Sequence, residues 1–173
     1  SETFAPQTEK DINGNQLAPI EGDTKELGIK AELFDDNMMV NFAIFNAEQM
    51  NIAVGDTVNS TPDNSVYIAA PGIQSQGYEL EISGELGWGV SANLGYTYTD
   101  IDVSDTLNAG NSEAQLVKDY TPKQVFKLAV KQEIAAVEGL SFGLNMRWQD
   151  DISRVQNAAA NFVTKQDAYA LVN

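Results

Sequence analysis

The stretch Ser75-Gln76-Gly77-Tyr78-Glu79-Leu80-Glu81-Ile82-Ser83-Gly84-Glu85-Leu86 alternates apolar and polar side chains. Tyr78, Leu80, Ile82 and Leu86 fall on one face, and the glutamates and serines fall on the other. Successive side chains of a β-strand point to opposite faces of a sheet, whereas a helix repeats about every 3.6 residues. The stretch therefore predicts a strand with one apolar face and one strongly polar face.

The same alternation recurs in segments of about ten residues along most of the chain. It predicts six complete strands, one final strand that begins near Asp167, and a stub over residues 1–4. The six complete strands cover residues 26–33, 38–47, 75–86, 90–99, 126–134 and 140–149.

The connections between these strands alternate in length. Tight turns at 35–37, 87–88 and 135–139 alternate with long polar stretches at 5–23, 51–74, 101–120 and 151–166. Such a meander is typical of an outer-membrane β-barrel, with short periplasmic turns and long extracellular loops. The longer strands suit the roughly 9 to 11 residues of a tilted membrane strand. We therefore expect an all-β fold, an antiparallel transmembrane β-barrel section of about seven long strands.

Composition excludes several classes of protein. The 173 residues hold 10 Lys and Arg against 25 Asp and Glu, so the net charge of −15 argues against a nucleic-acid partner. No stretch approaches the roughly 20 apolar residues of a membrane helix. Without Cys or His, the chain has no thiolate or imidazole metal site and no Ser/His or Cys/His catalytic centre. We expect neither an enzyme nor a cofactor or resident metal.

Several strings, taken in order, resemble the barrel of TonB-dependent ferric-siderophore receptors. They are Phe4-Ala5-Pro6-Gln7, Glu26-Leu27-Gly28-Ile29-Lys30, the stretch 75–86, Leu94-Gly95-Tyr96-Thr97-Tyr98-Thr99-Asp100, Thr121-Pro122-Lys123 and Tyr169-Ala170-Leu171-Val172-Asn173. Each string falls on the strand or loop expected for it, and together they cover nearly the whole chain.

The resemblance implies a function. Such receptors lie in the outer membrane of Gram-negative bacteria, bind a ferric siderophore outside the cell and import it with energy from the TonB complex. Their barrels have about 22 strands around a plugged lumen. Residues 1–173 would be a late part of that barrel domain, without the plug domain and the terminal strands. The absence of an initiator Met and of a signal peptide at the start of the chain likewise predicts an internal section of a longer polypeptide.

Ligand contacts in such a receptor are expected from external loops and from lumen-facing side chains near the outer rim. Aromatic faces suit planar chelating groups, and Arg suits an anionic chelate through paired hydrogen bonds. The loop candidates are Tyr67, Tyr120, Arg154 and Phe162, and the lumen candidates are Arg147 and Gln149.

Other polar and aromatic residues receive structural roles. Glu79 and Glu81 are expected to be lumen-wall charges paired with Lys127 or Lys131. A catalytic pair of carboxylates is not expected, because an open, water-filled wall lacks the desolvation that acid–base catalysis requires. The acidic run Asp100, Asp102 and Asp105 is interpreted as a solvated loop, and Trp88 and Trp148 as membrane-interface anchors.

Three alternatives share the alternating pattern. A complete eight-strand outer-membrane barrel of the anchoring type has a similar length, but only seven strands and a stub are counted. A porin-type channel is disfavoured by the receptor-like strings alone. A soluble sheet enzyme is disfavoured because no catalytic constellation is present.

Overall fold

A computed structural model describes the backbone of residues 1–110, 112–157 and 162–173. Side chains are described for all of these residues except those within 108–115 and 155–162. Contacts divide the chain into two units, and each is treated by itself. The loop unit comprises Ser1–Lys25, Phe45–Gln76 and Ile101–Tyr120. The strand unit comprises Glu26–Ile44, Gly77–Asp100 and Thr121–Asn173.

The long strands pair in a simple antiparallel meander. An eight-stranded sheet has the order β1-β2-β3-β6-β7-β8-β9-β12, so consecutive long strands are neighbours. The expected all-β meander of seven strands and a stub is confirmed. The bounds are β1 Glu2–Ala5, β2 Ile20–Leu33, β3 Met38–Met50, β6 Ile73–Gly87, β7 Val90–Val103, β8 Gln124–Glu133, β9 Ser141–Gln149 and β12 Tyr169–Val172.

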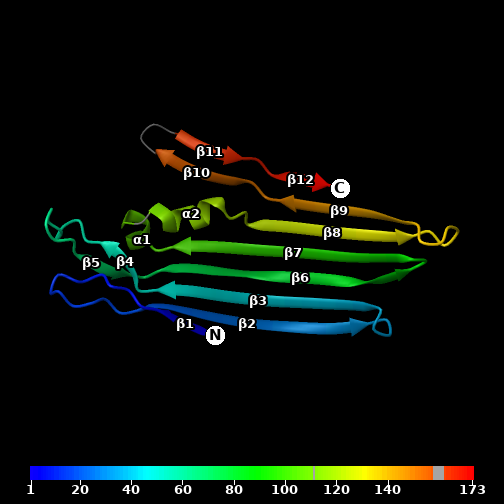
Figure 1. The fold of residues 1–173 in the computed structure, drawn as a ribbon, viewed down its shortest axis with the longest axis horizontal. Helices are drawn as coiled ribbons and strands as arrows, with labels where there is room; N and C mark the ends of the chain where they lie inside the picture. The colour runs from blue at the N-terminus through cyan, green and yellow to red at the C-terminus, as the bar shows by residue number, and fades with distance from the viewer. Residues whose placement is uncertain (111, 158–161) are drawn as a thin grey trace. The chain divides into compact units, whose positions relative to one another are not determined.

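Within the strand unit, short turns join neighbouring strands at one end (Figure 1). Strand β8 pairs with β7 from Val90↔Gln132 to Tyr98↔Gln124. It pairs with β9 from Val125↔Gln149 to Glu133↔Ser141. The register is continuous in both pairs, so the alternation seen in the sequence becomes two uniform faces of a sheet.

The turn between β6 and β7 is held in a demanding backbone conformation. Trp88 has a φ of 50° between Gly87 and Gly89, whose φ values are 87° and 76°. A bulky residue in this left-handed region is uncommon and needs support from its surroundings. The side-chain amide of Gln132 provides it by donating a 2.9 Å hydrogen bond to the carbonyl of Trp88.

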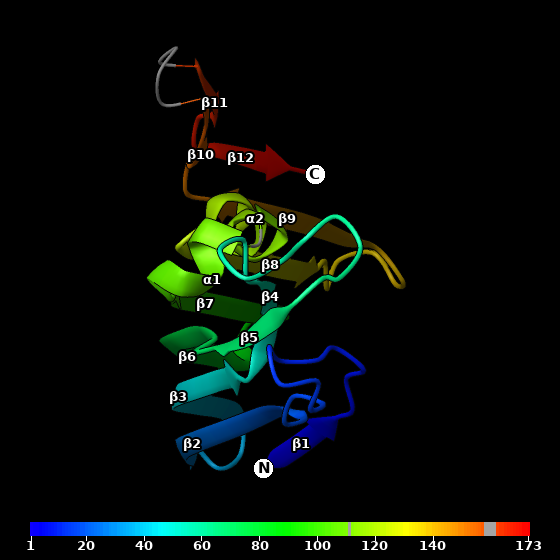
Figure 2. The ribbon, with the colours of Figure 1, turned by 90° about the vertical axis from the view of Figure 1, so that its left-hand side faces the viewer.

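The loop unit holds a small apolar core. Strands β4 (Ile52–Gly55) and β5 (Tyr67–Ala70) form an antiparallel hairpin, and helix α1 (Asp105–Gly110) contacts β4 (Figure 2). Val54, Ala70, Val103 and Leu107 cluster between them, and Leu107 is fully buried. A buried leucine contributes roughly 2 kcal/mol through the hydrophobic effect, so α1 fastens the loop 101–120 to the hairpin.

Three of the expected loops carry more secondary structure than the sequence indicates. Residues 101–120 contain α1 and α2 (Ser112–Tyr120), residues 51–74 contain β4 and β5, and residues 151–166 contain the hairpin β10 (Ile152–Asn157) and β11 (Phe162–Gln166). These elements are short, so each contains too few residues for a helical or strand repeat to be recognised within a polar loop sequence. None of the helices among the described residues is long and apolar enough to cross a membrane.

Candidate functional site

The strand unit presents its apolar side chains outward instead of burying them. The five buried apolar side chains in the described part of the chain all belong to the loop unit. On the strand unit, large apolar side chains of one face are exposed, with Leu27 at 69%, Ile29 at 70% and Phe142 at 62%. An apolar surface of this extent on neighbouring strands indicates contact with lipid or with another apolar partner.

Aromatic side chains gather on this apolar face toward the ends of β6 and β7 that lie away from the tight turns. The ring centroid of Tyr78 lies 6.4 Å from that of Phe42, 5.9 Å from Tyr96 and 5.3 Å from Tyr98. The hydroxyl of Tyr96 donates a 2.9 Å hydrogen bond to Oε1 of Gln124. Rings with one apolar side and one hydrogen-bonded polar tip are suited to a membrane–water interface.

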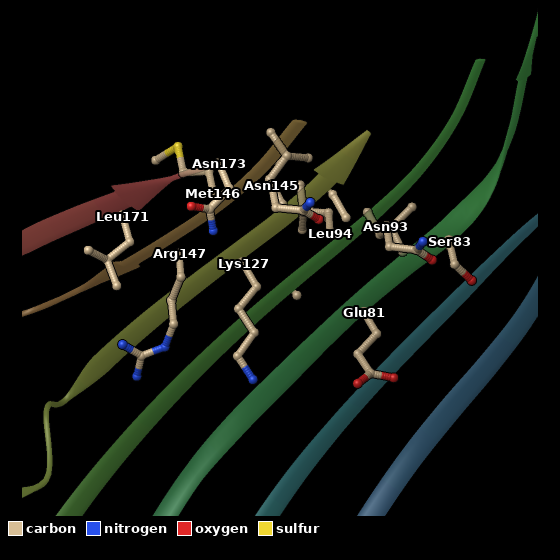
Figure 3. Close-up of a pocket in the computed structure, with 14 residues that line it drawn as sticks. Glu81, Ser83, Asn93, Leu94, Lys127, Asn145, Met146, Arg147, Leu171 and Asn173 are labelled. Carbon is tan, nitrogen blue, oxygen red and sulfur yellow. The ribbon is translucent and has the colours of Figure 1, made fainter. Parts of the chain in front are cut away.

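The opposite face of the strand unit is polar and carries a hollow of about 590 Å³. Figure 3 shows its lining side chains, which come from β6, β7, β8, β9 and the end of the chain at β12. Gly95 on β7 and Ala129 on β8 are small and leave space for the hollow. The charged residues around it are Glu81 on β6, Lys127 on β8 and Arg147 on β9. The polar and charged lining residues are Glu81, Ser83, Asn93, Lys127, Asn145, Arg147 and Asn173.

The expected ion pairs on this wall are wrong. Lys131 contacts Glu133 on its own strand, with Nζ 2.7 Å from the carboxylate oxygen. Among the described side chains, Lys127 has no carboxylate within salt-bridge distance, so neither lysine neutralises Glu79 or Glu81. Lys127, Lys131 and Glu133 lie on the same face of β8. Lys131 therefore reaches the carboxylate of Glu133 on its own strand instead of a glutamate on another strand.

The two lumen candidates lie together. Arg147 and Gln149 are two residues apart on β9, and the guanidinium Nη1 donates a 2.5 Å hydrogen bond to Oε1 of Gln149. Gln149 is 7% exposed, while Arg147 is partly exposed and lines the hollow. The buried amide of Gln149 therefore orients the guanidinium, and of these two candidates Arg147 is the one that lines the hollow.

The remaining candidate of the strand unit with a described side chain is Arg154. It lies on β10, opposite Thr164 of β11, and is partly exposed. The backbone of Phe162 belongs to β11, but its side chain is outside the described residues.

The loop unit contains the other two candidates. Tyr67 begins β5, and its backbone N–H donates a 2.9 Å hydrogen bond to the carbonyl of Lys10. Tyr67 also lines a polar hollow of about 500 Å³ with Lys10, Asp11, Asn64 and Ser65. Tyr120 ends α2 and is 47% exposed.

A structural feature of the loop unit that the sequence does not signal is a pair of side-chain amides that fasten the first loop. Nε2 of Gln7 donates hydrogen bonds to the carbonyls of Ala18 and Asn51, the latter at 2.8 Å. Nδ2 of Asn51 donates at 3.1 Å to the carbonyl of Pro19. Gln7 is 8% exposed, and its Oε1 has no hydrogen-bond partner among the described residues.

Two aspartates hold tight turns in the loop unit. Asp56 accepts a 2.6 Å hydrogen bond from Nδ2 of Asn59 and a 3.0 Å bond from the backbone N–H of Val58. These bonds, led by the one from the Asn59 side chain, hold the pKa of Asp56 below its ordinary value of 3.8. Asp11 likewise accepts the backbone N–H of Asn15 at 2.8 Å, which is the main cause of its lowered pKa.

Comparison with known proteins identifies the family. The family model described as TonB dependent receptor-like, beta-barrel matches residues 1–173. The ferripyoverdine receptor of Pseudomonas aeruginosa is 31% identical over 156 residues, which cover 86% of this chain and 18% of that receptor. The ferrichrome outer membrane transporter/phage receptor of Escherichia coli is 32% identical over 130 residues, covering 70% of this chain and 17% of the transporter.

A solved structure supports the same assignment. The pyoverdine outer membrane receptor of Pseudomonas aeruginosa, bound to pyoverdine, superposes with a TM-score of 0.76 and 30% identity over 99% of this chain and 25% of that one. The chain thus spans a quarter or less of the length of these relatives. The family match favours the receptor over a small eight-strand barrel or a porin. Residues 1–173 belong to the TonB-dependent receptor-like β-barrel family, whose members are transporters rather than enzymes and lie in the outer membrane of Gram-negative bacteria.

Proposed function

We propose that this chain is part of an outer-membrane receptor that binds a ferric siderophore and imports it with energy from the TonB complex. The observation that carries the proposal is a sheet whose apolar face is exposed and whose polar face is hollowed, in a chain that belongs to a family of such receptors. The apolar face would contact lipid, and the polar face would line the path of the chelate.

The relatives support a proposal for the substrate class. Receptors for ferripyoverdine and for ferrichrome are both near 30% identical to this chain, and a pyoverdine receptor superposes on nearly all of it. We therefore propose a ferric siderophore of the pyoverdine type as the ligand.

Residues 1–173 would contribute one part of the barrel domain. The TonB complex would act on a plug domain outside this chain. The proposal predicts that residues 1–173 alone, inserted into vesicles, do not take up a ferric chelate.

The ligand contacts proposed from this chain are those of its loops and outer wall. Tyr67 and Tyr120 would offer aromatic faces from the loop unit, and Phe162 would do so from the β10–β11 hairpin. Arg154 and Arg147 would donate hydrogen bonds to anionic oxygens of the chelate, with Gln149 orienting Arg147.

The proposal is tested with the full-length protein that contains this chain. Purified receptor is titrated with ferric pyoverdine, a ferric hydroxamate and a ferric catecholate, and binding is followed by quenching of tryptophan fluorescence. We expect saturable binding of ferric pyoverdine, weakened about tenfold by Arg154→Ala, because a charge-assisted hydrogen bond is lost.

Lys165→Ala is the matched control, since it removes a cation from the same hairpin that is engaged with Asp167 at 2.9 Å. Equal affinity of wild type and Arg154→Ala would remove Arg154 from the site. Failure of all three chelates to bind would overturn the proposed function.

A further inference from the structure

The cations of this chain are few, and most of them are neutralised locally. Acids outnumber bases 25 to 10, and six lysines have a carboxylate oxygen 2.6 to 3.3 Å from Nζ. Among the described side chains, Lys10, Lys127 and Arg147 have no such partner; Lys10 belongs to the loop unit, while Lys127 and Arg147 both line the polar wall of the strand unit. Two unneutralised cations on one wall are unexpected in a chain with so large an excess of acid.

These two cations are direct neighbours across the sheet. Lys127 on β8 is paired in register with Arg147 on β9, so both side chains leave the same face at the same level. Figure 3 shows the two side chains extending side by side into the hollow. Like charges placed directly opposite each other destabilise a sheet unless an anion lies between them or on top of them.

The residues on either side leave room for such an anion. Lys127 faces Gly95 on β7, and Arg147 faces Leu171 on β12. A Cβ at Gly95 would come no closer than 4.0 Å, to the Cβ of Lys127, so the space over β7 is open beside the lysine. Glu81, which lines the same hollow from β6, is not within salt-bridge distance of either cation.

The chemistry of the pair selects its ligand. Nη1 of Arg147 donates a hydrogen bond to Gln149, which fixes the orientation of the planar guanidinium. The other N–H groups of the guanidinium remain directed into the hollow. A planar guanidinium beside an ammonium group matches the two oxygens of a carboxylate.

We propose that Lys127 and Arg147 form a carboxylate-binding site on the polar wall of this protein. The proposal rests on the proposed function only in placing this wall inside the lumen of a receptor. The carboxylate would come from a soluble ligand in the lumen or from an acidic side chain of another part of the same protein, and the experiment separates the two sources.

The test measures the reactivity of the Lys127 amine in the full-length receptor. A neutral acylating reagent, the N-hydroxysuccinimide ester of acetic acid, is added in limiting amount, and acetylation of each lysine is followed by mass spectrometry. A carboxylate against Nζ accepts hydrogen bonds from the amine and covers it, so acetylation is slow. Lys30, which contacts Glu32 at 3.3 Å, is the internal reference.

Wild type and Arg147→Gln are compared without added anion, with succinate, and with the uncharged analogue succinamide. We expect Lys127 to be protected about tenfold in wild type relative to Arg147→Gln, with Lys30 unchanged. Protection without any added anion identifies an acidic side chain of the protein, and protection that appears with succinate but not with succinamide identifies a soluble carboxylate.

Two results would overturn the proposal. One is a Lys127 that reacts equally fast in wild type and in the variant under all three conditions. The other is acetylation of Lys127 that is as slow in Arg147→Gln as in wild type. The amine would then be shielded sterically, and no anion would be recognised by the pair of cations. Binding of ferric pyoverdine, measured on the same preparation, reports separately on the proposed function.

Discussion

Nε2 of Gln7 lies 2.8 Å from the carbonyl oxygen of Asn51 and donates a hydrogen bond to it across 44 residues of sequence. The same amide also donates to the carbonyl of Ala18, so one buried side chain ties the first loop to the end of β3. Gln7→Ala leaves two carbonyls without a donor, at a cost of about 1 to 3 kcal/mol.

We expect the loop over residues 5–19 to be cleaved several-fold faster in Gln7→Ala than in wild type when the receptor is treated with a broad-specificity protease. Gln76→Ala, at an exposed position of β6, is the control and should be cleaved like wild type. Equal cleavage of Gln7→Ala and wild type would show that the loop does not depend on this amide.

Gly72 marks the tightest packing in the loop unit. A Cβ built at this position would lie 1.3 Å from the carbonyl oxygen of Gln49, and the carbonyl of Gly72 accepts a 3.1 Å hydrogen bond from the backbone N–H of Ser104. Gly72→Ala therefore has to displace backbone, and we expect it to lower the free energy of unfolding by about 3 kcal/mol or more. Thermal unfolding followed by circular dichroism measures the loss.

Gly55→Ala is the matched control for Gly72→Ala. It lies at the end of β4 in the same unit, and a Cβ there meets nothing within 4 Å. The structure predicts an unchanged midpoint for Gly55→Ala. A midpoint for Gly72→Ala that matches this control would contradict the packing described.

The turn at Asp56 should depend on pH. Its pKa is held below the ordinary value of 3.8 in the folded protein, so the carboxylate stabilises the turn fully above that value. The stabilisation is lost as the pH falls through the lowered folded-state pKa. Asp56→Asn keeps an acceptor oxygen but does not titrate.

Hydrogen exchange of the backbone amides of Val58 and Asn59 measures this effect. We expect wild type to exchange more slowly than Asp56→Asn at pH 5 to 7, and the difference to disappear as the pH is lowered through the acid range below 3.8. A difference that does not change with pH would show that the charge of Asp56 does not hold the turn.

Much of the strand unit could be predicted from the sequence because each face of a strand meets a different medium. The alternation over 75–86 and 90–99 fixes which residues share a face, and the structure confirms it. The neighbour relation of Lys127 and Arg147 could not be predicted, because alternation assigns a face but not a register. The register of β8 and β9 depends on how the turn at 134–140 closes, from Glu133↔Ser141 onward.

The loop unit could be predicted least. Leu107 is the most deeply buried side chain among the described residues, yet it stands in a polar stretch with no periodic apolar pattern around it. Its burial depends on contact with β4, about fifty residues earlier in the chain. Ser104, whose Oγ accepts from the N–H of Leu107 at 3.4 Å, and Asp105 in the first turn are local signals for the start of α1.

The two faces of β7 should differ sharply in access to water. Asn93 is opposite Ala129 of β8 and Leu94 is opposite Leu128, so strand alternation puts the side chain of Asn93 on the polar face and that of Leu94 on the apolar face. The chain has no cysteine, so Asn93→Cys and Leu94→Cys give single probes in this region. A thiol reacts as its thiolate, which does not form readily in hydrocarbon.

In proteoliposomes, we expect a charged maleimide to label Asn93→Cys at least about tenfold faster than Leu94→Cys. Labelling both variants after the protein is unfolded in detergent checks that each thiol is intact. Equal labelling rates in the bilayer would contradict the assignment of the two faces.

Uptake of iron by whole cells distinguishes an energy-coupled receptor from a passive channel. Cells whose only siderophore receptor is the full-length protein containing these residues are given ferric pyoverdine labelled with radioactive iron. We expect saturable accumulation of iron that stops when a protonophore removes the energy supply of the TonB complex. Absence of accumulation, or accumulation that is unsaturable and insensitive to the protonophore as in a passive channel, would contradict it.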